Sequence, residues 1–162
     1  MINYDLDALE YISKLCDGHL RDALTMLDKC LAYSTELTLS NVMKALDLVD
    51  YSDMVNFLSS KYDYDYKGCL EVLNSIYMSG YDLKLFVRSL TEFMIDVCKA
   101  DIIDGERFMS CPMTDEVKKF LRETTDELEN RNMLASLVKL CNNIKWDTNP
   151  KARIEAWVMT GE

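Results

Sequence analysis

The spacing of apolar residues constrains the fold of this chain more than any other feature of its sequence. In the segment 83–103, apolar residues recur at intervals of three and four positions, the spacing of one face of an α-helix. Only 5 Gly and 2 Pro occur among the 162 residues, so few positions interrupt such segments. No segment shows sustained alternation with a period of two, and we therefore predict an all-α fold without a β-sheet. The residues on the apolar face of 83–103 are Leu83, Phe86, Leu90, Phe93 and Val97.

Three amphipathic segments in the first 50 residues predict a small three-helix bundle. They cover residues 5–16, 19–34 and 39–48, and the third has Thr38 as its candidate N-cap. We expect the apolar face of the second segment to be buried in this bundle. That face consists of Leu20, Leu24, Leu27 and Leu31.

A second, larger series of helices is predicted after a boundary near residues 49–51. Ser52 and Asp82 are candidate N-caps, and Asn149 before Pro150 is a typical start of a last helix. The segment 83–103 is the longest and most regular, so it is expected to be the central helix. The sequence thus predicts one domain over residues 1–50 and another over residues 51–162.

Charge and composition exclude several classes of function. The net charge of -10 repels phosphate backbones, and no run of Lys or Arg offsets it, so direct binding of nucleic acid is not expected. No apolar run approaches 18 residues, which predicts a soluble, cytoplasmic chain with no membrane association. The cysteines are spaced without a C-x-x-C pair, which favours free thiols and no metal site. They are Cys16, Cys30, Cys69, Cys98, Cys111 and Cys141.

Known catalytic motifs are missing from the sequence. It contains no GxxxxGK[ST], GxGxxG or HExxH, and its single histidine, His19, has no partner at a catalytic spacing. We therefore expect no free-standing catalysis and no catalytic residue in this chain. A small helical enzyme with a cofactor in its bundle is a weaker alternative, which a bound chromophore or metal would reveal.

Arg21 stands out in the stretch "DGHLRDAL", residues 17–24, because it falls in the first turn of a predicted helix. A cation is disfavoured there by the helix dipole unless a partner compensates. Two interpretations remain open on physical grounds. Either Arg21 is a surface charge paired with Asp17 or another local carboxylate, or it meets a phosphate presented by a neighbouring domain.

Beyond these patterns, the chain resembles a known family over most of its length. Residues 7–34 and the following "LTLSNVMKALDLVDY" resemble the lid region of the gamma/tau subunits of bacterial DNA polymerase III, which are AAA+ clamp-loader ATPases. "GYDLKLFVRSLTEFMIDVC" is similar to the long helix of their third domain, and "NNIKWDTNPKARIEAWVM" to its closing helix.

This resemblance implies a role for Arg21. The family's sensor-2 motif, G-x-x-R-D-A-L, places an arginine of the lid on the phosphates of ATP, and Arg21 occupies that position here. Leu20 would be a neighbour of the nucleotide, whereas His19 departs from the family's pattern and receives no role. The other matching residues are Gly18, Asp22, Ala23 and Leu24.

The resemblance also implies what the two domains do. Residues 1–50 would be the lid, and residues 51–162 a helical collar that holds clamp-loader subunits together in homo- and hetero-oligomers. ATP and Mg²⁺ would be bound in the full-length protein, an ATPase subunit of the polymerase holoenzyme, by a core upstream of the lid. The chain alone would then be an inactive C-terminal fragment that begins at an introduced or internal Met1 and carries no bound cofactor.

A different class of function remains as an alternative. The chain could be a stand-alone helical adaptor that binds other proteins and has no link to nucleotide. The upstream reading frame separates the two hypotheses: a GxxxxGK[ST] turn some 150 residues before Arg21 would support the clamp-loader module, and a true start codon at Met1 would support the adaptor.

Overall fold

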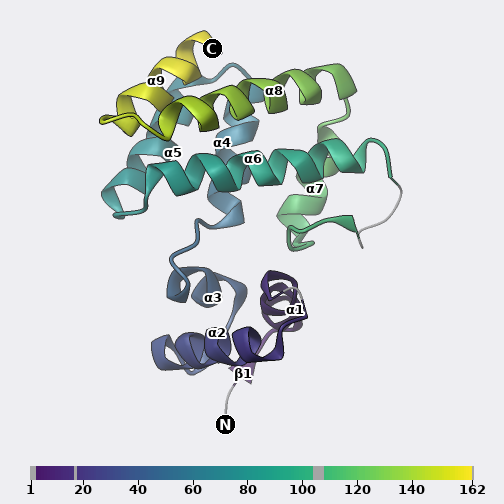
Figure 1. Cartoon of the computed structure of the whole chain (residues 1–162). Helices are drawn as coiled ribbons and strands as arrows, with labels where there is room; N and C mark the ends of the chain where they lie inside the picture. The colour runs from purple at the N-terminus through teal and green to yellow at the C-terminus, as the bar shows by residue number, and fades with distance from the viewer. Residues whose placement is uncertain (1–2, 17, 104–107, 162) are drawn as a thin grey trace.

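A computed structural model of the chain describes residues 3–16, 18–103 and 108–161. Within these residues the fold is built from helices, with two strands of two residues each (Figure 1). The predicted all-α fold is therefore confirmed. None of the helices in the described ranges is long and apolar enough to cross a membrane.

The chain begins with a small unit, here called the N-terminal bundle. Its elements are β1 (Asn3–Tyr4), α1 (Leu6–Leu15), α2 (Leu20–Tyr33), β2 (Glu36–Leu37) and α3 (Leu39–Ala45). The two strands form one parallel pair, so the prediction of no β-sheet was wrong. Two residues are too few to show a period of two, and the pairing joins segments more than 30 positions apart.

The core of the N-terminal bundle lies between α1, α3 and the second half of α2. It includes Ala8, Tyr11, Ile12, Cys30, Leu37, Val42 and Met43. The predicted burial of the whole apolar face of α2 was wrong, because Leu20 and Leu24 are 74% and 53% exposed. Both leucines lie in the first half of α2, whereas its buried residue, Cys30, lies near its end.

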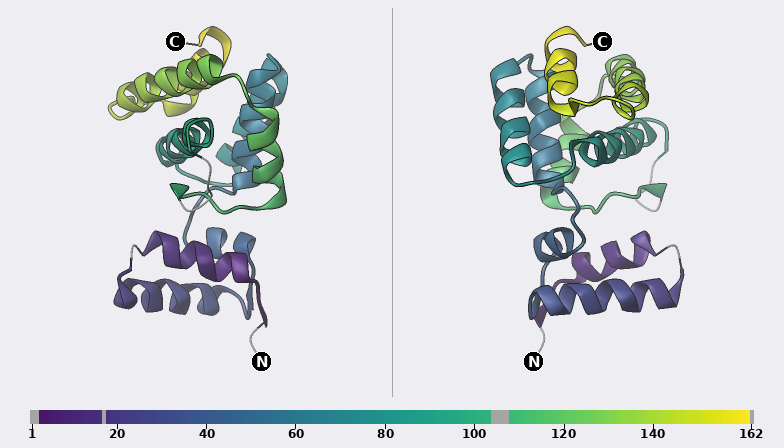
Figure 2. Two further views of the ribbon diagram at one scale, coloured as in Figure 1. Left: turned by 90° about the vertical axis from the view of Figure 1, so that its right-hand side faces the viewer. Right: turned by 60° about the vertical axis from the view of Figure 1, so that its left-hand side comes forward.

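Six further helices form what we call the C-terminal bundle. They are α4 (Tyr51–Tyr62), α5 (Tyr66–Met78), α6 (Leu83–Ala100), α7 (Asp115–Glu123), α8 (Glu127–Ile144) and α9 (Pro150–Thr160). Figure 2 shows α8 and α9 over one side of α6 and the α4, α5 and α7 layer along an adjacent side. The predicted central position of α6 is confirmed by its buried residues, among them Phe86, Val87, Leu90 and Met94.

Capping side chains define where most of these helices begin. Thr38, Asp82 and Asn149 accept hydrogen bonds from backbone N–H groups of the following turn, as predicted. The cap predicted at Ser52 was wrong, because the N-cap of α4 lies two residues earlier, at Asp50, whose carboxylate accepts from the Ser52 N–H at 3.0 Å. All six cysteines are free thiols, four of them buried.

Candidate functional site

Arg21 lies in the first turn of α2, close to the exposed end of the N-terminal bundle. Gly18 has a φ of 82°, a conformation that glycine adopts readily, and it turns the chain from α1 into α2. The side chain of the N-cap residue, His19, makes no capping bond, and its Nδ1 lies 3.1 Å from the carbonyl oxygen of Cys16. Since no side chain among the described residues caps this turn, it can receive an anion from outside the bundle.

The guanidinium of Arg21 is exposed. Among the residues that the structure describes, no carboxylate lies within ion-pair distance of it. Asp17, the local partner considered above, lies outside the described residues. The Thr25 hydroxyl donates to the backbone carbonyl of Arg21 at 2.9 Å, a bond that does not involve the guanidinium. The described surroundings thus leave the charge of Arg21 available to a ligand.

An apolar hollow of about 300 Å³ opens between α1 and α2, and its lining includes Leu20, the residue before Arg21. Leu20 and Leu24 lie on its α2 side, one helical turn apart, and Leu9 lies on its α1 side. A cation beside an exposed apolar surface is an arrangement that suits a ligand or partner with both an anionic and an apolar part. The remaining lining residues are Ile12, Ser13, Cys16, Gly18, His19, Ala23 and Leu27.

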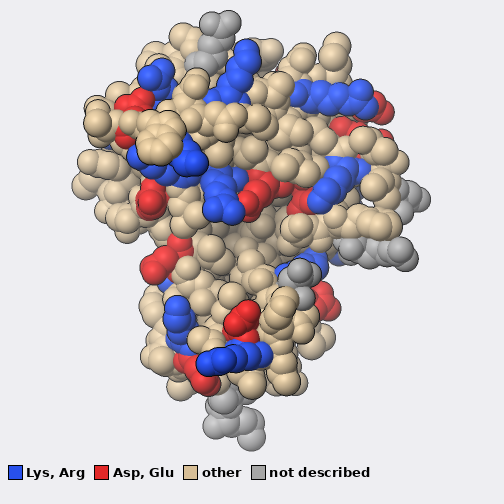
Figure 3. Space-filling model, viewed as in Figure 1, with Lys and Arg blue, Asp and Glu red and all other residues tan. Residues whose placement is uncertain are grey.

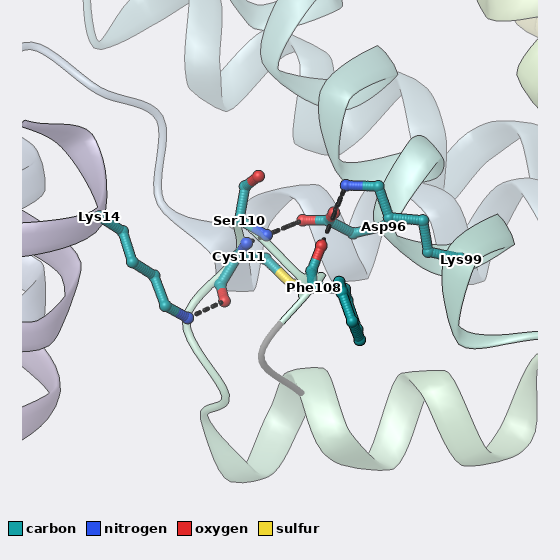
Figure 4. A network of polar contacts seen from close by, with 6 residues as sticks. All are labelled: Lys14, Asp96, Lys99, Phe108, Ser110 and Cys111. Carbon is teal, nitrogen blue, oxygen red and sulfur yellow. Dashed lines mark hydrogen bonds and ion pairs between the residues drawn. The ribbon is translucent and has the colours of Figure 1, made fainter. Parts of the chain in front are cut away.

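A polar network in the C-terminal bundle holds the segment 108–111 against α6 (Figure 4). The carboxylate of Asp96, only 2% exposed, accepts hydrogen bonds from the backbone N–H groups of Ser110 and Cys111, both at 2.8 Å. Its other oxygen accepts from Lys99 Nζ at 2.9 Å, and Lys99 also donates to the Phe108 carbonyl at 3.2 Å. Three hydrogen bonds therefore fix the backbone of this segment, and the ion pair between Lys99 and Asp96 links the two side chains that make them.

The N-terminal bundle contacts that same segment. Lys14, near the end of α1, donates from Nζ to the carbonyl oxygen of Cys111 at 3.1 Å, as Figure 4 shows. The Cys111 thiol is fully buried, and burial together with Asp96 raises its pKa to about 12. It therefore stays protonated at neutral pH, and its part in this junction is structural.

Aromatic rings form a second contact between the two bundles. Tyr11 of α1 packs edge-on against Tyr51 of α4, with ring centroids 5.9 Å apart, and Tyr51 packs in the same way against Phe93 at 5.4 Å. Burial is the main cause that raises the pKa of both phenols. The rings thus join α1 of the N-terminal bundle to α4 and α6 of the C-terminal bundle.

The junction was missed in the sequence, although one signal points to it. Asp96 lies between the apolar residues Ile95 and Val97 of a predicted helix. A carboxylate rarely lies among apolar residues unless it has hydrogen-bond or ion-pair partners. Its partners lie 14 and 15 residues further along the chain, so spacing on the helix could not name them.

Comparison with known proteins places this architecture in a family. The fold is a multi-helix domain preceded by a small helical bundle. The family model of DNA polymerase III subunits gamma and tau, domain III, matches residues 37–137, which is more than half of the chain. The chain belongs to this family, and the match begins within the N-terminal bundle, at the end of β2.

Two curated relatives agree with this assignment. DNA polymerase III subunit tau of Bacillus subtilis is 24% identical over 154 residues, which cover 94% of this chain and 27% of the relative. DNA polymerase III subunit gamma/tau of Mycoplasma genitalium is 26% identical over 98 residues, which cover 59% of this chain and 16% of the relative. The chain thus spans about a quarter or less of the relatives that it matches.

Proposed function

We propose that the chain is the lid and subunit-assembly module of a clamp loader, an ATPase that loads the sliding clamp on primed DNA. The N-terminal bundle is the lid and the C-terminal bundle is the collar. Membership in the gamma and tau family supports this proposal. The observation that carries it is the exposed Arg21, with no counter-ion among the described residues, directly after Leu20, which lines the apolar hollow between α1 and α2.

Arg21 is proposed to contact the phosphates of an ATP molecule held by a core domain that precedes the lid. A guanidinium offers several N–H donors in one plane, which suits a phosphate group. An anion at this position would also offset the unfavourable placement of a cation at the start of α2. The core would supply the nucleotide and Mg²⁺ sites, because one arginine cannot replace a full set of phosphate ligands.

The exposed leucines beside Arg21 support the same arrangement. Leu20 and Leu24 leave apolar area in water that a neighbouring domain or the nucleotide could cover. Leu20, the more exposed of the two, is the proposed neighbour of the nucleotide. When the phosphate that Arg21 contacts is lost, the lid would lose one attachment to the core and could rotate against it.

The collar is proposed to assemble subunits through its outer helix faces. It keeps several large apolar side chains in water, among them Met78, Ile102 and Leu128, which are each about 70% exposed. Homologous or identical collars would cover part of this area. Light scattering should then show association that increases with concentration, and a strict monomer at all concentrations would argue against self-assembly.

Arg21→Ala in the full-length protein tests the nucleotide role. The expected result is normal folding with DNA-stimulated ATP turnover reduced at least tenfold, because a contact to the phosphates is lost. Arg122→Ala, which removes an exposed arginine of α7, is the matched control and should leave turnover unchanged. Equal turnover in the two variants would contradict the sensor-2 assignment.

The alternative of a stand-alone adaptor uses the same hollow without nucleotide. An apolar hollow flanked by one cation could also receive a helix of another protein. The two proposals differ in one measurement: adding ATP to the full-length protein should protect residues 18–27 from hydrogen exchange only if the hollow belongs to an ATPase lid.

A further inference from the structure

A second exposed surface lies where the N-terminal end of α6 meets the C-terminal end of α8. Figure 3 shows basic side chains gathered over this end of the C-terminal bundle, although the chain as a whole carries a net charge of -10. A hollow of about 450 Å³ opens there. Its lining includes Lys84, Leu85, Arg88, Cys141, Ile144 and Lys145.

The basic groups around this hollow are only weakly neutralised. Lys84 donates from Nζ to the Lys145 carbonyl at 3.1 Å. The carboxylate of Asp147 is also within reach of its charge: the pKa of Asp147 is lowered by the Asn149 N–H, by Arg153 at 2.8 Å and, least, by Lys84. Arg88 pairs with Glu92 at 3.1 Å, but both side chains are more than 60% exposed, and such pairs contribute little. The nearest acidic residue in the lining, Asp82, accepts from two backbone N–H groups as the cap of α6.

Trp146 lies beside this hollow and is 84% exposed. The Lys145 ammonium lies 5.4 Å from the centre of its ring. Tryptophan and arginine are the residues that most often dominate binding energy at protein interfaces, and so large an apolar ring in water is unusual. A fixed cation next to an exposed ring offers both an electrostatic and an apolar contact.

We propose that this surface binds a short acidic peptide segment of a partner protein. Carboxylates of the segment would meet Lys84, Arg88 and Lys145, and one large apolar side chain would enter the hollow beside Trp146. Charge complementarity of this kind directs encounter and excludes basic partners. Dissolved salt screens electrostatic interactions beyond about 10 Å. A short segment bound here is therefore attracted by the basic surface and is not repelled by the acidic remainder of the chain.

The same observations favour a peptide over a nucleic acid. Three basic residues neutralise few phosphates, and a longer strand would extend onto acidic surface. The hollow has Leu85, Cys141 and Ile144 in its lining, which suits an aliphatic or aromatic side chain better than a charged backbone.

Fluorescence titration of the 162-residue chain with a defined probe tests the proposal. The probe is a ten-residue peptide with five Glu and one central Phe and without Trp. We expect a saturable change in the emission of Trp146, because Trp157, the other tryptophan, is fully buried. Trp146→Phe should abolish the signal.

Paired charge reversals locate the binding site. The double variant Lys84→Glu, Lys145→Glu should weaken binding at least tenfold. The control Lys29→Glu, Lys67→Glu changes the net charge equally at exposed positions outside the hollow and should stay within twofold. Circular dichroism of both double variants checks that each is folded, and Arg88→Gln provides a milder variant with the same expected direction.

Other outcomes would overturn the proposal. One is a titration that does not saturate below about 1 mM peptide. Another is equal affinity for a peptide that has Gln in place of each Glu. A third is an equal loss of affinity in the two double variants. Tighter binding of a ten-nucleotide oligothymidine would assign the surface to single-stranded DNA instead. A change in Trp146 emission on simple dilution would assign it to a second copy of this chain.

Discussion

The ammonium group of Lys14 donates to the carbonyl oxygen of Cys111 at 3.1 Å, although the two residues are 97 positions apart. Lys14 belongs to α1, which packs beside α2 and Arg21, and Cys111 is held by Asp96 of α6. The bond therefore connects the bundle that carries Arg21 with the central helix of the other bundle. A change in the position of α1 would act directly on the segment 108–111.

Lys14→Met should loosen this connection with little effect on global stability. The variant keeps most of the aliphatic stem and removes the donor, so we expect less than about 1 kcal/mol of lost unfolding free energy. Hydrogen exchange of the α1 amides should become faster, because α1 loses an anchor. Lys29→Met on α2 is the control and should leave hydrogen exchange in α1 unchanged. Equal changes in exchange rate in the two variants would contradict the anchoring role of Lys14.

Asp96→Asn should destabilise the C-terminal bundle. The carboxylate accepts from two backbone N–H groups and from Lys99, and an amide can replace only part of this set. Hydrogen bonds to a charged group contribute more than neutral ones, so the expected loss is about 1.5–3 kcal/mol in urea unfolding. Glu92→Gln, at an exposed ion pair on the same helix, should cost less than about 0.5 kcal/mol. Similar losses in both variants would contradict the structural role of Asp96.

Asn130 and Tyr62 should show strong energetic coupling. The fully buried Asn130 accepts from the Tyr62 hydroxyl at 2.6 Å and donates to Asp101 and to the Thr124 carbonyl. Asn130→Ala is expected to cost about 2–4 kcal/mol, because it leaves buried polar groups without partners. Tyr62→Phe should cost about 1 kcal/mol, and the double variant less than the sum of the two. An additive double-mutant cycle would show that the bond contributes nothing.

Stability should fall in alkaline solution. The pKa of Cys111 is raised from 9.0 to about 12, and those of Tyr11 and Tyr51 are raised from 10.0, chiefly by burial. Each group then contributes stability that is fully present below its unfolded pKa. That stability is lost as the pH rises toward the folded pKa, because the unfolded chain releases the proton first.

The pH range from 9 to 12 should therefore be the sensitive one, with a slope of up to about 1.4 kcal/mol per pH unit for each group. Tyr51→Phe removes one of these groups, keeps the ring, and should flatten the decline above pH 10. Urea unfolding at pH 8, 9, 10 and 11 measures both slopes. Parallel declines in the two proteins would argue against the buried phenol as a cause.

Local patterns in the sequence predicted the elements of the fold well. The spacing of three and four in α6 and the caps at Thr38, Asp82 and Asn149 depend only on residues within one or two turns. The cap of α4 shows the limit of this reasoning, because Asp50 and Ser52 are both good caps by type. Val49 is buried in the core of the C-terminal bundle, and this contact places Asp50 at the start of the helix.

The candidate sites were predictable to different degrees. The position of Arg21 in the first turn of a helix follows from its sequence neighbours, whereas its exposure and the hollow beside it do not. The surface around Trp146 was not anticipated, because it combines residues 84–88 with residues 141–146. Those segments are adjacent only because α6 and α8 pack in opposite directions (Figure 1).

The sequence by itself determined that the chain is helical, where most helices begin, and which faces are apolar. These properties arise from hydrogen bonds and side-chain spacings within a few residues. The tertiary structure decided which apolar faces are covered, as the exposed Leu20 and the buried Leu90 illustrate. It also decided the partners of Asp96, Lys14 and Tyr51. Burial and polar pairing depend on contacts between residues far apart in the sequence, and those contacts exist only once the helices have packed.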